Sequence, residues 1–442
     1  MYQSKLQEKS KVNNKTFLDS IKNSGVSFWI DSSGGPKEHC NLSFYNANPN
    51  YYFYGFLNKI TIVKGNKTEN LRKNCFNFIE QKLEEEKNNK DGIFVGYFAY
   101  DLFQREYQGE PRYPDFFFAY FENMHEMNPR EPKTKGPKSF DISTLRHLKS
   151  NMTNNEYLDK VKYIKNQIKE GNVYQVNLTR EYSLELENID EIDLYKKLRN
   201  VSPNPYGCFF KTPFVTILSS SPEEFLYAGP QEPPNRIIRT RPVKGTFPKN
   251  IFDVDEKNKA ENIMIVDIER NDLGKICEYG SVNAAKLLEI EPYQHLNHAV
   301  STVEGKLRQD VSLREIFEAT FPGGSITGAP KIAAMKIIND VEPAQRGAYA
   351  GSFGYIRTDG SMDFNILIRT IFITHKCHPE PSEGSHNVMR SFVANAPQND
   401  NLKIVTFNVG GGIVADSDPG EELEEIKLKA RGILNTLGIK EL

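Results

Sequence analysis

Alternating apolar and polar positions predict short strands in the first part of the chain. Residues 26–30 (VSFWI) form one such pattern, and it ends in the turn sequence DSSGG at residues 31–35. Residues 92–100 (GIFVGYFAY) are apolar and aromatic throughout, which is typical of a strand buried on both faces. The longest apolar runs have the length of strands, so no membrane-spanning segment is predicted.

Helical spacing dominates after residue 150. Thr153 and Glu156 have the spacing of a capping box, and the apolar positions that follow predict a helix ending near Gly171. Further helices are predicted over residues 258–272, from Pro330 to residue 340, and along the apolar stripe of residues 423–437.

Between these helices the pattern returns to strands. Residues 173–183 predict a strand with Tyr174, Val176 and Leu178 on one face and the polar side chains of Gln175, Asn177 and Thr179 on the other. Shorter strands are predicted at 214–219 and 236–240. Residues 349–369 read as a hairpin that turns at residues 358–360, and a strand over 403–409 precedes three glycines.

A proline-, lysine- and glycine-rich stretch begins near residue 127 and suggests a division of the chain. We expect an N-terminal region at 1–126, a linker at 127–150 and a larger region at 151–442. The polar tract 375–401 predicts an exposed loop. A chain of 442 residues exceeds one ordinary core, so two domains or one large composite domain are expected.

Composition narrows the functional classes. The chain has 56 basic and 58 acidic residues and a net charge of −2, which argues against a nucleic-acid footprint or a polybasic membrane patch. Its five cysteines are odd in number and widely spaced, so neither a disulfide framework nor a zinc site is predicted. The first 20 residues show no apolar secretion signal, and a cytoplasmic location is expected.

Two glycine-rich stretches could approach a ligand. In residues 323–331 (GGSITGAPK) the glycines precede a helix start, where backbone N–H groups can face an anion. This is no nucleotide phosphate loop, because Ala329 stands where the lysine is needed. Gly410, Gly411 and Gly412 also allow a close backbone approach. Taken alone, each stretch is better explained as a structural turn or bend.

Several charged residues have the chemistry of an active site. Glu223 and Lys244 together would form an acid and a nucleophile, although an isolated lysine on a turn is usually a surface residue. Glu261 lies within an apolar helix, and Glu422 and Glu425 border an apolar stripe. Carboxylates in such positions can bind Mg²⁺, but an ordinary Glu–Lys pair with Lys429 is also possible.

Taken together and in order, these motifs resemble component I of the chorismate-utilising enzymes. That family includes anthranilate, aminodeoxychorismate, isochorismate and salicylate synthases. The resemblance covers roughly residues 150–440 and is highly specific. It rests on YQVNL at 174–178, SPE at 221–223, RPVKGT at 241–246, AENIMIVD at 260–267, RND at 270–272, HAVS at 298–301, residues 321–331, GSFGY at 351–355, IRT at 368–370, residues 410–416, Glu422 and Glu425.

The resemblance implies a fold of class α/β (α+β), with two mainly antiparallel β-sheets packed as a central sandwich and helices outside. It implies Mg²⁺ as the cofactor and a set of site residues. Catalytic roles fall to Lys244, Glu223 and His298, metal binding to Glu261, Glu425 and Glu422, and substrate binding to Thr327, Tyr355, Arg369, Gly411, Gly412, Gln175 and Lys429. A tryptophan site at Ser32 and Ser33 matches only loosely.

Two positions separate the branches of the family. Gln175 stands where water-adding members carry a lysine, and an amide cannot act as a base. Lys244 stands where anthranilate synthases typically carry alanine. Both residues favour the aminodeoxychorismate synthase branch, in which ammonia replaces the C4 hydroxyl of chorismate. Lys257-Asn258-Lys259 departs from a common Lys-Asp-Arg pattern and could weaken support for Mg²⁺.

Ammonia needs a source. None of the five cysteines lies in a nucleophile-elbow motif, so a separate glutamine amidotransferase partner is expected. Anthranilate synthase component I is the alternative enzyme. A non-catalytic, tryptophan-binding regulatory module is the alternative from another class, and the joint presence of Lys244, Glu223, Glu261 and Glu425 argues against it.

Overall fold

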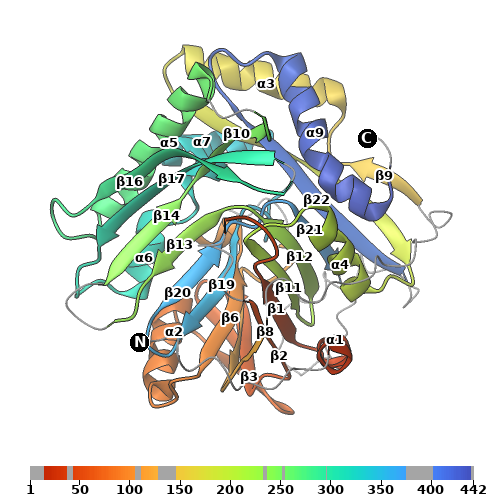
Figure 1. Cartoon of the computed structure of the whole chain (residues 1–442), viewed down its shortest axis with the longest axis vertical. Coiled ribbons are helices and arrows are strands. Elements are labelled where there is room, and N and C mark those ends of the chain that lie inside the picture. Colours follow the sequence, from red (N-terminus) through yellow and green to blue (C-terminus); the bar gives the residue numbers. More distant parts are fainter. Residues whose placement is uncertain are drawn as a thin grey trace.

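The computed structural model describes residues 14–36, 43–104, 111–127, 146–231, 236–250, 254–294, 296–374 and 402–439. The predicted loop 375–401 and most of the predicted linker lie outside these residues. Within them, two large antiparallel β-sheets face each other and helices lie on the outside (Figure 1). This arrangement confirms the predicted fold class.

The first sheet has ten strands within the described residues, in the order β18-β10-β22-β21-β12-β11-β1-β2-β8, with β9 paired to β10. Their bounds are β1 Ser27–Asp31, β2 Ser43–Ala47, β8 His125–Met127, β9 Arg146–Ser150, β10 Gln175–Glu187, β11 Tyr206–Lys211, β12 Val215–Ser221, β18 Gly328–Ala329, β21 Thr370–Thr374 and β22 Leu402–Ile413.

The second sheet has twelve strands within the described residues, in the order β15-β17-β14-β13-β20-β19-β6-β7-β3-β4-β5, with β16 paired to β17. Their bounds are β3 Tyr51–Phe56, β4 Lys59–Lys64, β5 Lys67–Leu71, β6 Ile93–Phe98, β7 Phe116–Phe121, β13 Glu224–Ala228, β14 Ile237–Arg241, β15 Val243–Pro248, β16 Asn283–Pro292, β17 Leu296–Lys306, β19 Ser352–Arg357 and β20 Met362–Asn365.

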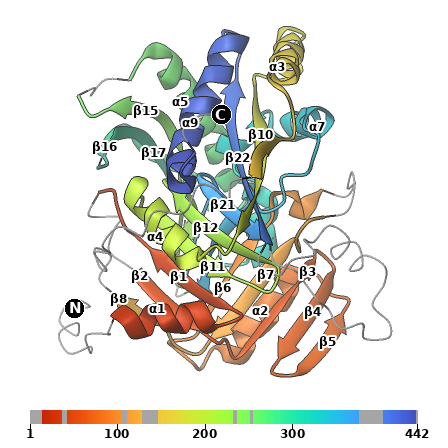
Figure 2. The same cartoon turned by 90° about the vertical axis from the view of Figure 1, so that its right-hand side faces the viewer.

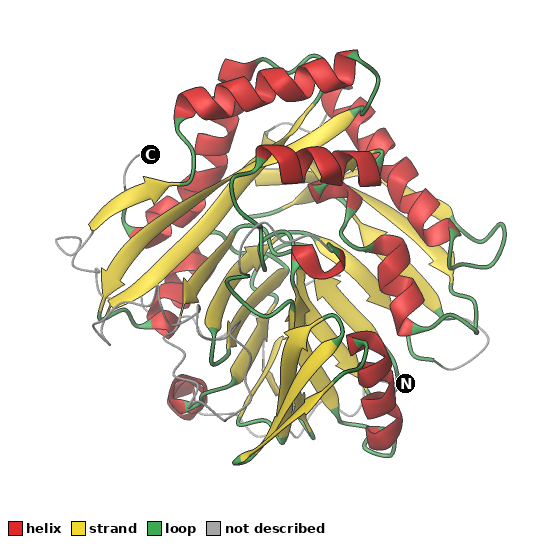
Figure 3. Ribbon diagram, turned by 180° about the vertical axis from the view of Figure 1, so that it is seen from behind, coloured by secondary structure: helices red, strands yellow, loops and turns green. Residues whose placement is uncertain are grey.

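The helices cover the outer faces of the sheets (Figure 3). Their bounds are α1 Asn14–Asn23, α2 Cys75–Glu86, α3 Asn154–Lys169, α4 Glu191–Val201, α5 Glu256–Gly274, α6 Leu313–Thr320, α7 Lys331–Val341 and α9 Pro419–Leu437, with short 3-10 turns η1 Tyr100–Phe103 and η3 Gly324–Ile326. No described helix is both long enough and apolar enough to cross a membrane.

Aromatic side chains fill the space between the two sheets. The rings of Phe28 and Phe121 lie 4.9 Å apart between centroids, and those of Phe210 and Phe353 lie 5.1 Å apart. Each pair joins a strand of one sheet to a strand of the other. A second core lies between the ten-stranded sheet and helices α1, α3, α4, α7 and α9. Of these helices, α3, α7 and α9 lie beside β10 and β22, and α1 lies beside β1 and β2 (Figure 2). Burial of these faces fixes the sheets that carry the site.

Strands from both ends of the sequence share each sheet. β1 pairs with β11, and β6 pairs with β19. The N-terminal region 1–126 and the region 151–442 therefore do not form separate sheets. Of the predicted linker, residues 146–150 form β9.

Most predicted elements have counterparts in the structure. Thr153 and Glu156 form the predicted capping box at the start of α3. The predicted hairpin is β19 and β20. One prediction differs, because Gly410, Gly411 and Gly412 lie within β22 and do not follow it. They pair there with residues 177–179 of β10, so the ladder continues through the glycines to Ile413.

Candidate active site

The glycines of β22 let polar side chains come together over the sheet. Gly412 is paired with Asn177, two residues after Gln175 on β10. A Cβ atom on Gly412 would lie 2.5 Å from Nε2 of Gln175 and 3.2 Å from Nζ of Lys244. A larger residue would therefore push Gln175 and Lys244 away, which explains the need for glycine here.

Gln175 has an unusual environment for an amide. Gln175 is fully buried, and neither Oε1 nor Nε2 of its side chain has a hydrogen-bond partner among the described residues. Buried polar groups are normally paired, because an unpaired one loses its hydrogen bonds to water. An unpaired amide beside Lys244 can therefore receive a small polar ligand.

Lys244 forms an ion pair with Glu261. The Nζ–Oε2 distance is 3.1 Å, and the two side chains are 14% and 13% exposed. Lys244 comes from β15 and Glu261 from the facing helix α5. Gly245 follows Lys244 with a φ of 98°, a conformation that favours glycine. The structure thus brings together two residues predicted to act in catalysis and metal binding.

Helix α9 carries the other two predicted metal ligands. An added Cβ atom on Gly411 would lie 3.3 Å from Oε2 of Glu422, 3.7 Å from Nζ of Lys429 and 3.9 Å from Oε1 of Glu425. Glu422 accepts a hydrogen bond of 2.6 Å from Ser417, and Glu425 forms a 2.6 Å ion pair with Lys429. Lys429 also donates to the carbonyl oxygen of Gly410.

These carboxylates are hard oxygen donors of the kind that bind Mg²⁺. Glu261 and Glu425 each hold a lysine ammonium group, so both already face a positive charge. Within the described residues, no three acidic, histidine or cysteine side chains converge closely enough to hold a metal ion. The donor chemistry suits the cation, and Mg²⁺ binding stays a prediction.

Glu223 lies at the end of the loop between β12 and β13 and is buried. Burial, together with the nearby charge of Glu269, raises the pKa of its carboxyl group to about 7. The Ser325 hydroxyl, the backbone at Val243 and the charge of Lys244 act in the opposite direction. A carboxyl group with this pKa is largely protonated in weakly acidic solution and can donate a proton.

His298 is buried on β17 between two strands. Its Nδ1 lies 3.4 Å from the carbonyl oxygen of Gly245, and its ring packs edge-on against Tyr293 at 4.6 Å. Burial, with the positive charge of Arg369, lowers the pKa of His298 to about 3. His298 is therefore neutral near pH 7 and suits hydrogen bonding better than acid catalysis.

Arg369 is the predicted carboxylate-binding residue. Burial lowers the pKa of its guanidinium group, whereas the nearby Tyr293 and Glu223 act to raise it. Within the described residues its side chain forms no ion pair, and it adopts a φ of 51°. The group is therefore available to bind an anion in the two-pronged manner typical of arginine.

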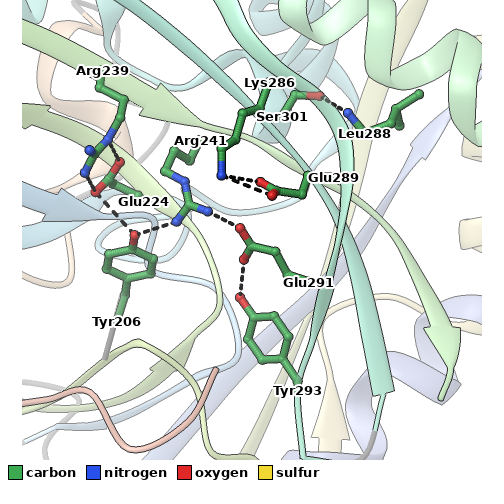
Figure 4. A network of polar contacts seen from close by, with 10 residues as sticks. All are labelled: Tyr206, Glu224, Arg239, Arg241, Lys286, Leu288, Glu289, Glu291, Tyr293 and Ser301. Carbon is green, nitrogen blue, oxygen red and sulfur yellow. Dashed lines mark hydrogen bonds and ion pairs between the residues drawn. The ribbon is translucent and has the colours of Figure 1, made fainter. Parts of the chain in front are cut away.

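A polar network surrounds Arg241 (Figure 4). Arg241 forms an ion pair with Glu291 and donates a 3.1 Å hydrogen bond to the hydroxyl of Tyr206. Tyr293 donates to Glu291 at 3.5 Å, and Tyr206 donates to Glu224 at 3.2 Å. The network connects β14 and β16 with the tyrosine that packs against His298.

Thr327 and Tyr355 are predicted to bind substrate, and this stays a prediction. Thr327 is fully buried, and its hydroxyl donates to the carbonyl oxygens of Gly323 and Gly324 at 3.0 and 3.3 Å. It therefore holds the turn that carries Ser325. Tyr355, on β19, lines a cavity between the sheets.

That cavity has a volume of about 300 Å³ and is lined by Ser32, Pro205, Phe353 and Tyr355, with Glu224, Arg239 and Asp363 as its charged residues. The loosely predicted tryptophan site thus includes Ser32 at the cavity wall. Ser33 does not line it, and its hydroxyl donates to the carbonyl oxygen of Asn204 at 3.4 Å.

Sequence reasoning missed Glu269, Glu291 and Tyr293. Glu269 lies two helical turns after Glu261 on α5, so the same helix face could have indicated it. Glu291 and Tyr293 had no comparable signal, because their roles depend on how β16 and β17 pair.

Comparison with known proteins agrees with this geometry. Residues 34–379 match the family described as chorismate binding enzyme. The chain is 36% identical over 299 residues to anthranilate synthase component 1 of Synechocystis, covering 65% of this chain and 54% of that protein. It is 35% identical over 300 residues to aminodeoxychorismate synthase component 1 of Bacillus subtilis, covering 65% and 57%.

A third relative, aminodeoxychorismate synthase component 1 of Klebsiella aerogenes, is 35% identical over 332 residues, which cover 72% of this chain and 66% of that protein. The chain thus spans about half to two-thirds of the length of these relatives.

Solved structures show the same fold. Anthranilate synthase component I from Streptococcus pneumoniae superposes with a TM-score of 0.65 at 23% identity, covering 88% of this chain and 91% of that one. The menaquinone-specific isochorismate synthase of Escherichia coli gives a TM-score of 0.66 at 16% identity, covering 97% and 92%.

Proposed function

Because the chain belongs to the chorismate binding enzyme family, we propose that it is an aminodeoxychorismate synthase component I. In this proposal it joins chorismate and ammonia to give 4-amino-4-deoxychorismate and water, a step of p-aminobenzoate and folate biosynthesis. The observation that carries the proposal is Lys244, whose amine lies beside Gln175 and Gly412 and 3.1 Å from Glu261.

Glu223 acts as the general acid. The C4 hydroxyl of chorismate is a poor leaving group until it is protonated, and Glu223 holds a proton because burial raises the pKa of its carboxyl group to about 7. As Lys244 attacks C2, both ring double bonds shift, the C4–O bond breaks, and the C4 oxygen leaves as water with the Glu223 proton.

Lys244 acts as the nucleophile. Its ammonium group must first leave Glu261 and lose a proton, since only the neutral amine can attack. Ammonia then forms a bond to C4, both ring double bonds shift back, and the C2–N bond to Lys244 breaks. The buried amide of Gln175, which has no partner among the described residues, would hydrogen-bond ammonia in this step.

The substrate carboxylates need fixed partners. Arg369 suits one of them, because its guanidinium forms no ion pair among the described residues, and the glycine backbone of β22 permits close contact. His298 is neutral and suits a role in orienting the ring.

Mg²⁺ forms part of the proposal. Glu261, Glu425 and Glu422 would hold it, and the ion would neutralise a substrate carboxylate. A glutamine amidotransferase partner would supply ammonia, and the proposal places both proteins in the cytoplasm.

A product assay tests the function. The purified chain is incubated with chorismate, Mg²⁺ and ammonium, and the products are separated by chromatography. We expect 4-amino-4-deoxychorismate and no pyruvate in the absence of a lyase. Pyruvate release with anthranilate would identify the alternative, anthranilate synthase component I, which the 36% identity to the Synechocystis enzyme supports. No turnover would contradict both assignments.

The cavity at Ser32 supports a second, non-catalytic function. Its volume of about 300 Å³ and its mixture of aromatic and charged walls suit an amino acid such as tryptophan. Calorimetric titration with tryptophan tests this, and a Tyr355→Ala variant should lose any binding. Binding without chorismate turnover would favour a regulatory module.

A further inference from the structure

Ser301 lies on β17 opposite irregular stretches of both neighbouring strands. The ladder between β15 and β17 shifts its register within residues 243–246, the stretch that contains Lys244. The ladder between β16 and β17 shifts its register within residues 286–289. A β-bulge changes the direction of the side chains that it contains, so the direction of Lys244 depends on how this stretch is held.

Hydrogen bonds connect Ser301 to both of these strands and to one helix. Its backbone N–H donates to the carbonyl oxygen of Pro242 at 3.1 Å, two residues before Lys244. Its hydroxyl accepts from the backbone N–H of Leu288 at 3.0 Å (Figure 4) and donates to Oδ1 of Asn262 on α5 at 2.6 Å. Leu288 has a φ of 52°, which is uncommon outside glycine, and the Ser301 hydroxyl satisfies its N–H in this conformation.

Asn262 occupies a core-facing position on α5 and is fully buried. Val266 and Leu273 follow it by one and three turns on the same face of the helix, and both belong to the apolar core. Apolar contacts alone are compatible with several registers, whereas a buried polar residue with one fixed partner selects a single register. The hydrogen bond to Ser301 therefore fixes where this part of α5 lies along β17, and Glu261 is the residue directly before Asn262.

We propose that Ser301 and Asn262 are positioning residues that hold Lys244 and Glu261 against each other. Ser301 is bonded both to the strand that carries Lys244 and to the residue that follows Glu261, so it places both partners of the 3.1 Å ion pair. The importance of this for turnover rests on the proposed roles of Lys244 and Glu261, because a displacement of about 1 Å in a reacting group can lower a rate roughly a hundredfold.

A double-mutant cycle in urea unfolding measures the coupling between Lys244 and Glu261 without substrate or metal. The cycle compares Lys244→Ala, Glu261→Gln and the double variant, first with Ser301 present and then in the Ser301→Ala background. We expect the coupling to fall to roughly half or less, because α5 is no longer fixed to β17. Asn262→Ala removes the same hydrogen bond from the helix side and should give the same fall. It also supplies the second background if Ser301→Ala does not fold. An unchanged coupling overturns the proposal.

Ser281→Ala is the matched control. The Ser281 hydroxyl donates to the carbonyl oxygen of Glu278 at 2.7 Å and accepts from the backbone N–H of Lys306 at 3.1 Å. These are the same kinds of hydrogen bond at the other end of β17. Ser281→Ala should leave the coupling between Lys244 and Glu261 unchanged. A similar fall in this variant would mean that Ser301 has no specific effect on the pair.

Turnover separates this inference from the proposed function. With chorismate, Mg²⁺ and ammonium, we expect Ser301→Ala and Asn262→Ala each to lower kcat roughly tenfold, with the KM for chorismate changed by less than about twofold. The double variant should be no slower than either single variant, because both remove one shared hydrogen bond. Additive losses would contradict the proposal.

The failures of the two proposals are distinguishable. If Lys244→Ala keeps the wild-type kcat, the nucleophile assignment is wrong, and the coupling measurement still decides the role of Ser301. If kcat falls in Ser301→Ala while the coupling keeps its wild-type value, the positioning role is wrong and the assignment of Lys244 stands.

Discussion

Single residues at this site are placed for chemistry at the expense of stability. Gln175 is the clearest example, because its buried amide lacks any hydrogen-bond partner among the described residues. A nonpolar residue of similar size would avoid that loss. The choice of glutamine therefore indicates a ligand that completes its hydrogen bonds.

Gln175→Leu should stabilise the protein and impair the reaction. We expect the free energy of unfolding in urea to rise by about 1–3 kcal/mol, the range for removing an unpaired buried polar group. Turnover with ammonium should fall at least tenfold. Gln81→Leu on the exposed face of α2 is the control for a simple gain in hydrophobicity. Lower stability of Gln175→Leu would show that the amide is satisfied in solution.

Lys244→Ala should lose most of the amination activity and redirect part of the flux to anthranilate. The reason is that no amine remains to form the bond at C2, whereas the acid and the anion-binding groups stay in place. Chromatography of the products measures the shift, and intact mass of trapped wild-type enzyme should reveal a chorismate adduct. Lys286→Ala is a control at a half-exposed lysine. A wild-type rate in Lys244→Ala would refute the role of Lys244 as the nucleophile.

At the scale of elements, the site depends on how two helices lie over two strands. β10 and β22 bring Gln175 and the glycines together, whereas α5 and α9 place Glu261, Glu422 and Glu425 over them. Behind this layer, the Arg241–Glu291 pair joins the end of β14 to β16, with both side chains under a tenth exposed. Such a pair holds the strands in register around His298.

Glu291→Ala should destabilise the fold strongly. Removing one partner of a buried ion pair leaves the other charge without compensation, and we expect a loss of about 3–5 kcal/mol in the free energy of unfolding. Glu318→Ala breaks the half-exposed pair with Arg314 and should lose less than about 1 kcal/mol. Equal losses in the two variants, measured by urea unfolding, would mean that the Arg241–Glu291 pair adds nothing.

For the whole molecule, buried acids make stability depend on pH. Burial raises the pKa of Glu223 and of Glu269 from 4.5 to about 7. Between these values the folded state holds protons that the unfolded state has released, so unfolding becomes easier as pH rises through this window. Each group contributes up to roughly 3 kcal/mol.

Urea unfolding between pH 5 and 8 without Mg²⁺ measures this slope. Glu223→Gln should reduce the pH dependence of the free energy of unfolding by the contribution of one carboxyl group. Asp267→Asn should not change it, because that side chain is exposed. An unchanged slope in Glu223→Gln would mean that the carboxyl group reaches water.

The sequence predicted the fold class, the helix caps and most elements, because local periodicity and capping residues determine them. Recognisable motifs also made Lys244, Glu223, Glu261 and Arg369 candidates, and their roles stay predictions. It failed where the answer depends on side-chain direction after folding. Glu291 and Tyr293 meet Arg241 and His298 only because β16 and β17 pair, and no sequence pattern indicates those contacts.

The position of β22 has a consequence for synthesis. This strand lies between β10 and β21 in the middle of its sheet, yet it is the last described strand to leave the ribosome. Until residues 402–413 emerge, the facing edges of β10 and β21 present unpaired N–H and C=O groups. Such edges can pair with strands of other chains. A nascent chain paused before residue 402 should therefore bind chaperones, and a separately supplied peptide of β22 and α9 should compete for that gap.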